Sequence, residues 1–156
     1  MNTRTEKDSL GELQVPAEAY YGVHTCRSIQ NFNAAGETIP LEMIHGMVKL
    51  KWACAKANAA LGQLPADKLD AIAKACQRIL GGEFSDQFPV DCFQAGSGTS
   101  SNMNVNEVIS NIANELMGGK RGDRGLVHPN DDVNKGQSTN NIFPSGIRVA
   151  CVDLTD

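Results

Sequence analysis

The sequence from residue 96 to residue 104 reads Gly96-Ser97-Gly98-Thr99-Ser100-Ser101-Asn102-Met103-Asn104, and a helical pattern follows it. This stretch combines two glycines, four hydroxyls and two amides, and its first large apolar side chain is Met103. Such a composition predicts a turn that presents backbone N–H groups and hydroxyl donors at the N-terminus of a helix. Because the first amides of a helix attract negative charge, we expect the turn to bind a small anion.

The helix after this turn is predicted from its apolar face, and it is expected to begin near Ser100 and to end at Gly118-Gly119. The face comprises Val105, Val108, Ile109, Ile112 and Leu116. The same segment carries five asparagines, at positions 102, 104, 106, 111 and 114, which need water or a bonded partner. A solvated face is the simplest interpretation of these amides. The Thr99 hydroxyl has two possible roles, contact with a ligand or capping of the helix.

Two further helices are predicted upstream, over residues 40–62 and 65–80, because proline opens each of them and glycine follows each end. Residues 1–39 show no helical period, but the segment 10–16 predicts a short strand or ribbon. A last helical pattern begins at Ile142, and we expect its apolar face to pack on a partner or on a continuation of the chain. The predicted fold is therefore mainly α, with a short β ribbon near the N-terminus.

A second donor-rich turn, Gln137-Ser138-Thr139-Asn140-Asn141, lies before the last helix. Ser138 and Thr139 each offer one donor and Asn140 offers two. The same residues could simply cap a helix that begins before Pro144. Two such turns without a run of cations favour a small carboxylate as the ligand.

Composition excludes several classes of function. The chain has 156 residues and a net charge of −4, and without a basic run it has no electrostatic basis for binding nucleic acid. It contains no apolar stretch long enough for a membrane span and no apolar signal segment at its polar N-terminus, so we expect a cytoplasmic protein. The five scattered cysteines and three histidines show no metal-ligand spacing, so neither a disulfide framework, a metal nor a cofactor is expected.

Two further candidates have competing interpretations. His128 precedes Pro129-Asn130-Asp131, and it could be a general acid, an anion contact or the cap of a turn. Arg27 could bind a carboxylate bidentately or form a surface ion pair.

Three of these segments together resemble the fumarase/aspartase superfamily of lyases, in the order in which that family has them. They are Val15–Thr25, Gln94–Val108, and His128–Lys135 together with Gln137–Asn140. The resemblance implies the N-terminal helical domain of such a lyase over residues 1–141, and the start of a truncated central helical domain over residues 142–156. Two departures are Asn141, where the family usually has aspartate, and Gly125, where bacterial fumarases often have arginine.

The resemblance also implies roles for individual residues. Thr99, Ser138 and Thr139 would be catalytic, and a dicarboxylate would contact Arg27, Ser97, Thr99, Ser100, Asn102, Ser138, Thr139 and Asn140. A possible secondary anion site would comprise His128, Asn130 and Asp131. The family's general base, a serine on a flexible loop, has no counterpart in these residues, so the isolated chain is expected to be inactive. Family enzymes are homotetramers whose sites combine several subunits.

The activity implied is reversible elimination from a dicarboxylate to give fumarate. The pattern narrowly favours aspartate ammonia-lyase, which releases ammonia from L-aspartate. The alternatives are a class II fumarate hydratase, which acts on malate and fumarate, and a truncated, non-catalytic helical module that binds a dicarboxylate.

Overall fold

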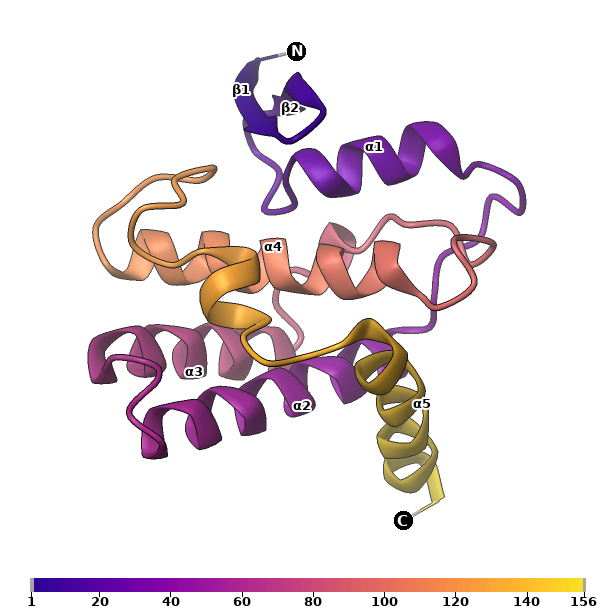
Figure 1. Ribbon diagram of the computed structural model, residues 1–156. Coiled ribbons are helices and arrows are strands. Elements are labelled where there is room, and N and C mark those ends of the chain that lie inside the picture. The colour runs from indigo at the N-terminus through magenta and orange to yellow at the C-terminus, as the bar shows by residue number, and fades with distance from the viewer. Residues whose placement is uncertain (1, 156) are drawn as a thin grey trace.

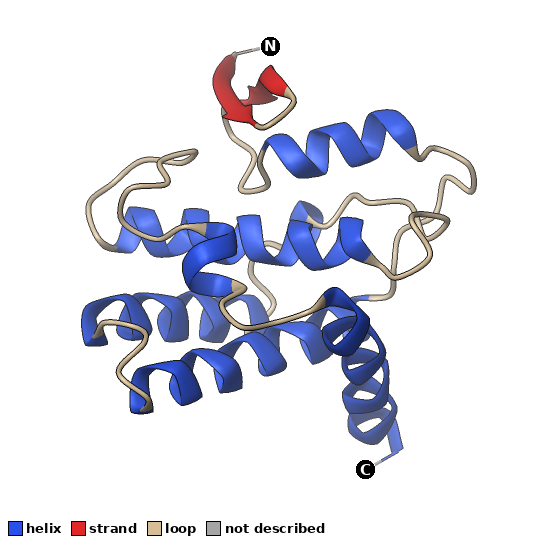
Figure 2. Ribbon diagram, viewed as in Figure 1, coloured by secondary structure: helices blue, strands red, loops and turns tan. Residues whose placement is uncertain are grey.

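The N-terminal ribbon is an antiparallel hairpin in the computed structural model, which describes residues 2–155. Strand β1 (Thr3–Asp8) pairs with β2 (Gly11–Pro16) over their full lengths, from Thr3 opposite Pro16 to Asp8 opposite Gly11. Figure 2 shows the hairpin at one end of a molecule that is otherwise helices and loops. The prediction of a mainly α fold with a short β ribbon is confirmed.

Three long helices form the body of the molecule. Helices α2 (Leu41–Ala60) and α3 (Ala66–Leu80) lie side by side, and α4 (Thr99–Leu116) runs alongside α3 and also contacts α2 (Figure 1). Pro40 and Pro65 immediately precede α2 and α3, as the sequence predicts, because a proline lacks the N–H that the first helical turn leaves unbonded. A short 3-10 turn, η1 (Ser85–Gln87), and an irregular segment connect α3 to α4.

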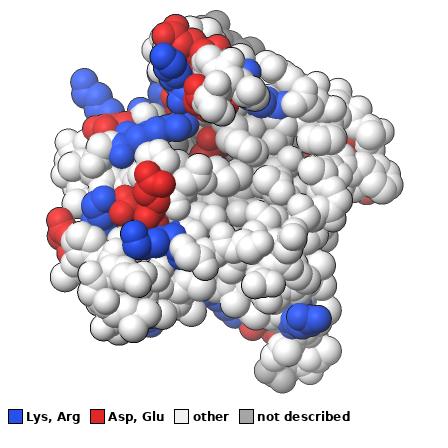
Figure 3. Space-filling model, viewed as in Figure 1, with Lys and Arg blue, Asp and Glu red and all other residues white. Residues whose placement is uncertain are grey.

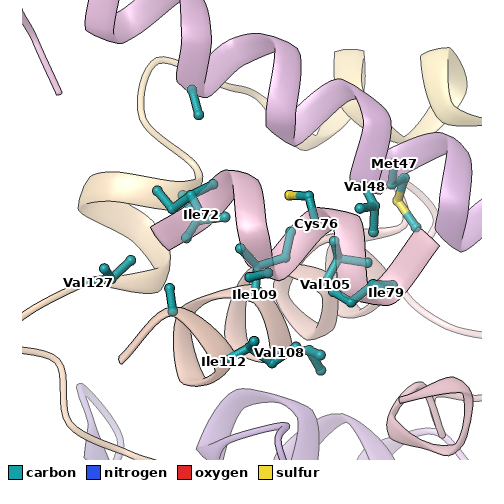
Figure 4. Close-up of a cluster of buried hydrophobic side chains, with 14 of the residues drawn as sticks. Met47, Val48, Ile72, Cys76, Ile79, Val105, Val108, Ile109, Ile112 and Val127 are labelled. Atoms are coloured by element: carbon teal, nitrogen blue, oxygen red, sulfur yellow. The ribbon is translucent and has the colours of Figure 1, made fainter. Parts of the chain in front are cut away.

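The main hydrophobic core lies where α4 packs on α2 and α3 (Figure 4). The predicted apolar face of α4 is buried there except for Leu116, which is 44% exposed. Burial of each large aliphatic side chain contributes about 1.5–3 kcal/mol, so this junction dominates the stability of the fold. The core members labelled in Figure 4 are Met47, Val48, Ile72, Cys76, Ile79, Val105, Val108, Ile109, Ile112 and Val127.

Helix α4 is polar but buried, so the expectation that its asparagines form a solvated face is wrong. Asn104, Asn111 and Asn114 are at most 5% exposed because neighbouring loops cover them. The Asn104 amide donates to Gln87 O at 3.0 Å. Asn111 donates to Tyr20 O at 2.7 Å, and Asn114 accepts from Val127 N at 2.8 Å. These side chains anchor loops that have no regular backbone pairing of their own.

Residues 23–31, expected to be irregular, form helix α1 (Val23–Asn31). Its N-terminus is capped by a residue far away in the sequence, the buried Glu107 of α4. That carboxylate accepts from the backbone N–H groups of Gly22, His24 and Thr25 at 2.9, 2.9 and 3.1 Å. The negative charge also lies at the positive end of the α1 dipole, where it is stabilising. The helix therefore depends on a tertiary contact that no local pattern reveals.

The last helix, α5 (Thr139–Thr155), crosses α2 at two glycines, Gly46 and Gly146. A side chain at either position would collide with the opposite helix, so the backbones can approach closely there. Of the apolar face that was expected from Ile142 onward, only Ile142 and Ala150 are buried. The C-terminal half of α5 projects from the body of the molecule (Figure 1). The predicted domain boundary between residues 141 and 142 falls inside α5. The division of the chain into two domains stays a prediction.

None of the helices over residues 2–155 combines the length and the apolar character that crossing a membrane requires.

Candidate functional site

The first donor-rich turn leads directly into α4. Gly98 occupies the N-cap position in the left-handed region, with φ 73°, and no side chain caps the helix there. The half-buried Thr99 hydroxyl instead lies 3.1 Å from the Ser97 hydroxyl. Within the described chain the amides of Thr99 and Ser100 have no hydrogen-bond partner, whereas the Ser101 amide donates to Gln94 Oε1 at 2.9 Å. Two unbonded amides and a hydroxyl therefore lie at the positive end of α4.

The second turn leads into α5 in a similar way. The exposed Ser138 hydroxyl accepts from Asn140 N at a long 3.3 Å, so the capping interpretation holds for Ser138. Thr139 is half-buried, and its Oγ1 accepts from Asn102 Nδ2 at 3.1 Å. Asn140 is exposed. The start of α5 thus presents hydroxyl and amide groups next to the start of α4.

The two turns are adjacent in space, as the sequence analysis requires. The Asn102–Thr139 hydrogen bond joins the first turn of α4 to the first turn of α5. Phe143 of α5 lies against Gly98, where a side chain of any size would collide with the ring. Asn102 is buried, and its Oδ1 has no hydrogen-bond partner in the described chain. The donor-rich turns therefore begin two helices that adjoin at Asn102 and Thr139.

A hollow of about 530 Å³ lies at the first of these turns. It brings Thr99 and Ser100 together with Arg27 of α1 and Asn130. Ser138, Thr139 and Asn140 do not line it. The lining residues that sequence reasoning did not assign to the site include Arg124, which adjoins the Gly125 position where bacterial fumarases often have arginine, and His24, whose Nδ1 is buried and without a partner in the described chain.

Arg27 is engaged by an internal acid. Its Nε and Nη2 donate to the two carboxylate oxygens of Asp8 at 2.8 and 2.9 Å, and Nη2 also donates to Gly11 O at 3.0 Å. These bonds lower the pKa of Asp8 below its ordinary value. The ion-pair interpretation of Arg27 therefore holds, and only Nη1 has no hydrogen bond within residues 2–155. Its role in binding a substrate carboxylate stays a prediction.

His128 caps a turn. Its Nδ1 accepts from the amides of Asn130 and Asp131 at 3.2 and 3.1 Å, at the start of the short π-helical turn η2 (Pro129–Val133). Nδ1 must be unprotonated to accept these bonds, so any proton on the neutral ring is carried by Nε2. The cap alternative is the one that the structure bears out. A secondary anion site at His128, Asn130 and Asp131 stays a prediction.

The two turns themselves carry no charged side chain. No Asp, Glu, Lys or Arg occurs between Asp91 and Glu107 or between Lys135 and Arg148. In Figure 3 the charged side chains gather at the hairpin and along the left edge of the view, and the side where α4 and α5 begin is almost entirely uncharged. Helix ends and neutral donors at the turns, together with Arg27 and Arg124 in the hollow, can therefore attract an anion at this surface.

These features define a helical domain with two adjoining, donor-rich helix starts, and comparison with known proteins places it in a family. The sequence signature of the family described as "Lyase" matches residues 11–156, and the chain belongs to this family, within the fumarase/aspartase superfamily.

Several relatives and solved structures that the chain resembles carry the names fumarate hydratase, fumarase or fumarate lyase. The chain is 49% identical to "Fumarate hydratase class II" of Ralstonia nicotianae over 97% of its own length, and 52% identical to that of Halobacterium salinarum over 96%. A fumarate lyase:delta crystallin structure from Brucella melitensis superposes with a TM-score of 0.94 at 47% identity, covering 96% of this chain and 34% of the other. A class II fumarase from Schistosoma mansoni superposes with a TM-score of 0.91 at 43% identity, covering 96% and 32%.

The chain spans about a third of the length of the curated relatives that it matches, 33% and 32% for the two named above. These relatives are hydratases, so the narrow preference for aspartate ammonia-lyase in the sequence pattern has less support than its alternative.

Proposed function

We propose that this chain supplies carboxylate-binding donors to a class II fumarate hydratase, which interconverts fumarate and malate. The observation that carries the proposal is the junction of the two turns, where the Asn102–Thr139 hydrogen bond links two helix N-termini. The names of the relatives at 49% and 52% identity favour water over ammonia as the leaving group.

The chemistry of the reaction explains why such a junction is useful. Removal of a proton from the carbon beside a carboxylate gives an aci-carboxylate with additional negative charge. Donors that already point at this charge lower the barrier, and each is worth about 2.7–4 kcal/mol in comparable oxyanion sites. Thr99, Ser138 and Thr139 are the proposed catalytic donors. Ser97, Ser100, Asn102, Asn140 and Arg27 are the proposed substrate contacts.

The remaining machinery is proposed to come from outside these residues. The superfamily resemblance assigns the general base to a serine loop that has no counterpart here and the complete site to several subunits of a homo-oligomer. We therefore expect the isolated chain to bind fumarate without sustained turnover.

The test is a graft in which this chain replaces the matching third of the Ralstonia nicotianae relative. Formation of fumarate from L-malate or from L-aspartate is followed by ultraviolet absorbance. Turnover of L-malate is expected, with Thr99→Ala in the same graft as the comparison. Turnover of L-aspartate instead would make the enzyme an ammonia-lyase. A folded graft without either activity, with fumarate still bound by the chain alone, would favour the non-catalytic module.

A further inference from the structure

A fully buried lysine lies behind the two donor-rich turns. Lys51 of α2 is 0% exposed, and it lies on the same helix face as the buried Ile44, Val48 and Ala55. The sequence carries a signal for this, because positions 44, 48, 51 and 55 follow the helical period of an apolar stripe. A lysine at such a position loses its hydration, which costs stability whenever its amine is charged.

Among residues 2–155 the buried amine has no Asp or Glu as a hydrogen-bonded or ion-pair partner. The titratable groups that face it are the thiols of Cys54 on α2 and Cys76 on α3. Burial raises the pKa of Cys76 to about 12, so this thiol stays neutral. On η2, Asp132 is already bonded to Lys68 Nζ at 2.7 Å. The starts of α4 and α5 contribute no charged side chain. Burial therefore lowers the pKa of Lys51 to about 7, and its amine changes charge near neutral pH.

A chain of hydrogen bonds connects this amine to the candidate site. Lys51 Nζ donates to Asn134 Oδ1 at 2.6 Å, and Asn102 Nδ2 donates to the same oxygen at 3.2 Å. Asn102 Nδ2 also donates to Thr139 Oγ1 at 3.1 Å. The two lone pairs of Asn134 Oδ1 are then both used, and Asn134 Nδ2 donates to Gln137 O at 3.0 Å. The Asn134 amide thus has one orientation, which also holds the turn before Ser138.

We propose that Lys51 is a positioning residue for the dicarboxylate site. Its amine holds the Asn134 side chain in place, and Asn134 in turn orients Asn102 and Thr139. Binding of a dianion at the two turns is accompanied by binding of a proton to the Lys51 amine. This inference rests on the proposed function.

Mutual attraction of buried charges provides the coupling. A cation beneath an otherwise uncharged surface favours a bound dianion, because water screens the pair poorly at a buried position. By linkage, the dianion must favour the protonated amine to the same extent. Fumarate is therefore expected to bind with uptake of a proton near pH 7, even though its own carboxyls are ionised throughout this range.

The first experiment measures the ligand-free chain by NMR between pH 5.5 and 9. The Lys51 side-chain resonances are expected to titrate with a midpoint near 7, and the amide resonances of Thr139 and Asn140 are expected to show the same midpoint. That shared transition should disappear in Lys51→Met and persist in Lys56→Met, a matched control at an exposed lysine on the same helix. If Lys51 titrates in the wild type while the Thr139 amide stays unchanged, the positioning role is overturned, whether or not the variant folds.

The second experiment measures fumarate binding by the same resonances at pH 6 and pH 8.5. Wild type and Lys56→Met are expected to bind about tenfold more weakly at the higher pH, within the usual range of coupling between two sites. Lys51→Met should lose this difference. Fumarate binding with the same pH dependence in all three proteins would overturn the inference and leave the proposed function standing. No binding at either pH would overturn both.

Discussion

Beyond the first turn of α4, Asn104, Asn111 and Asn114 are bonded to the backbone of neighbouring loops, whereas in the first turn of the same helix the polar side chains face the hollow and the start of α5. Asn111 and Asn114 each hold a loop by hydrogen bonds on both sides of the side-chain amide. Asn102 has an unpartnered buried Oδ1 instead, and so does Asn106, whose Nδ2 donates to Met103 Sδ at 3.4 Å. The difference teaches that residue type alone does not identify a loop-anchoring amide, and that the partners of each amide do.

The largest effect is expected from Glu107→Ala, in the structural part of α4. The substitution leaves the N–H groups of Gly22, His24 and Thr25 buried without their acceptor. Each buried donor left without an acceptor costs about 1–3 kcal/mol, and three lose their acceptor together here. Denaturant unfolding should show this loss of stability together with loss of α1 helicity by NMR. A decrease below about 1 kcal/mol would mean that the carboxylate does not cap α1.

A somewhat smaller effect is expected from Asn114→Ala. This change removes the acceptor of the Val127 N–H and the donor to the Val127 and Asp123 carbonyls. Unsatisfied buried groups cost about 1–3 kcal/mol each, and a cavity adds to this. Chemical denaturation gives the measurement, and fumarate binding by the folded fraction should be unchanged. Weaker fumarate binding by a fully folded variant would contradict the division of α4 into a loop-anchoring part and a ligand-facing first turn.

The opposite sign is expected for Lys51→Met, which replaces a buried amine by a side chain of similar volume. Such replacements often stabilise a protein by about 1–4 kcal/mol. The native pKa is lowered from 10.5 to about 7, so the unfolded chain binds more protons between these values. Wild-type stability therefore rises with pH across this window. The variant's advantage should be largest at pH 6 and small near pH 10, as measured by urea unfolding. A constant difference would contradict the depressed pKa.

The smallest effect on stability is expected from Thr99→Ala, at the functional end. Its hydroxyl is bonded only to Ser97 and does not cap α4, so the free energy of unfolding should change by less than about 0.5 kcal/mol. Loss of a hydrogen bond to a charged ligand should still weaken fumarate binding about tenfold. NMR titration measures the binding, and Ser85→Ala, at an exposed turn, serves as the control. Unchanged binding would remove Thr99 from the site.

The sequence predicted the features that depend on interactions between neighbouring residues, and it missed the features that depend on residues far apart in the chain. The limits of α2 and α3 were predictable because proline and glycine act on their own neighbours. Helix α1 was not predicted, because its cap is the carboxylate of Glu107 on a different helix. The two donor-rich turns were recognisable from composition, but the part played by Lys51 and Asn134 depends on bonds between α2, η2 and α4.

By itself, the sequence determined a mainly helical chain with two neutral, donor-rich turns at helix starts, since helical period, breakers and local donors are encoded within a few residues of each other. Only the tertiary structure decided that these turns meet, that Asp8 engages Arg27 and that the asparagines of α4 are buried. Those outcomes depend on contacts between residues far apart in the chain. Their geometry is set by how the helices pack, and no local pattern carries that information.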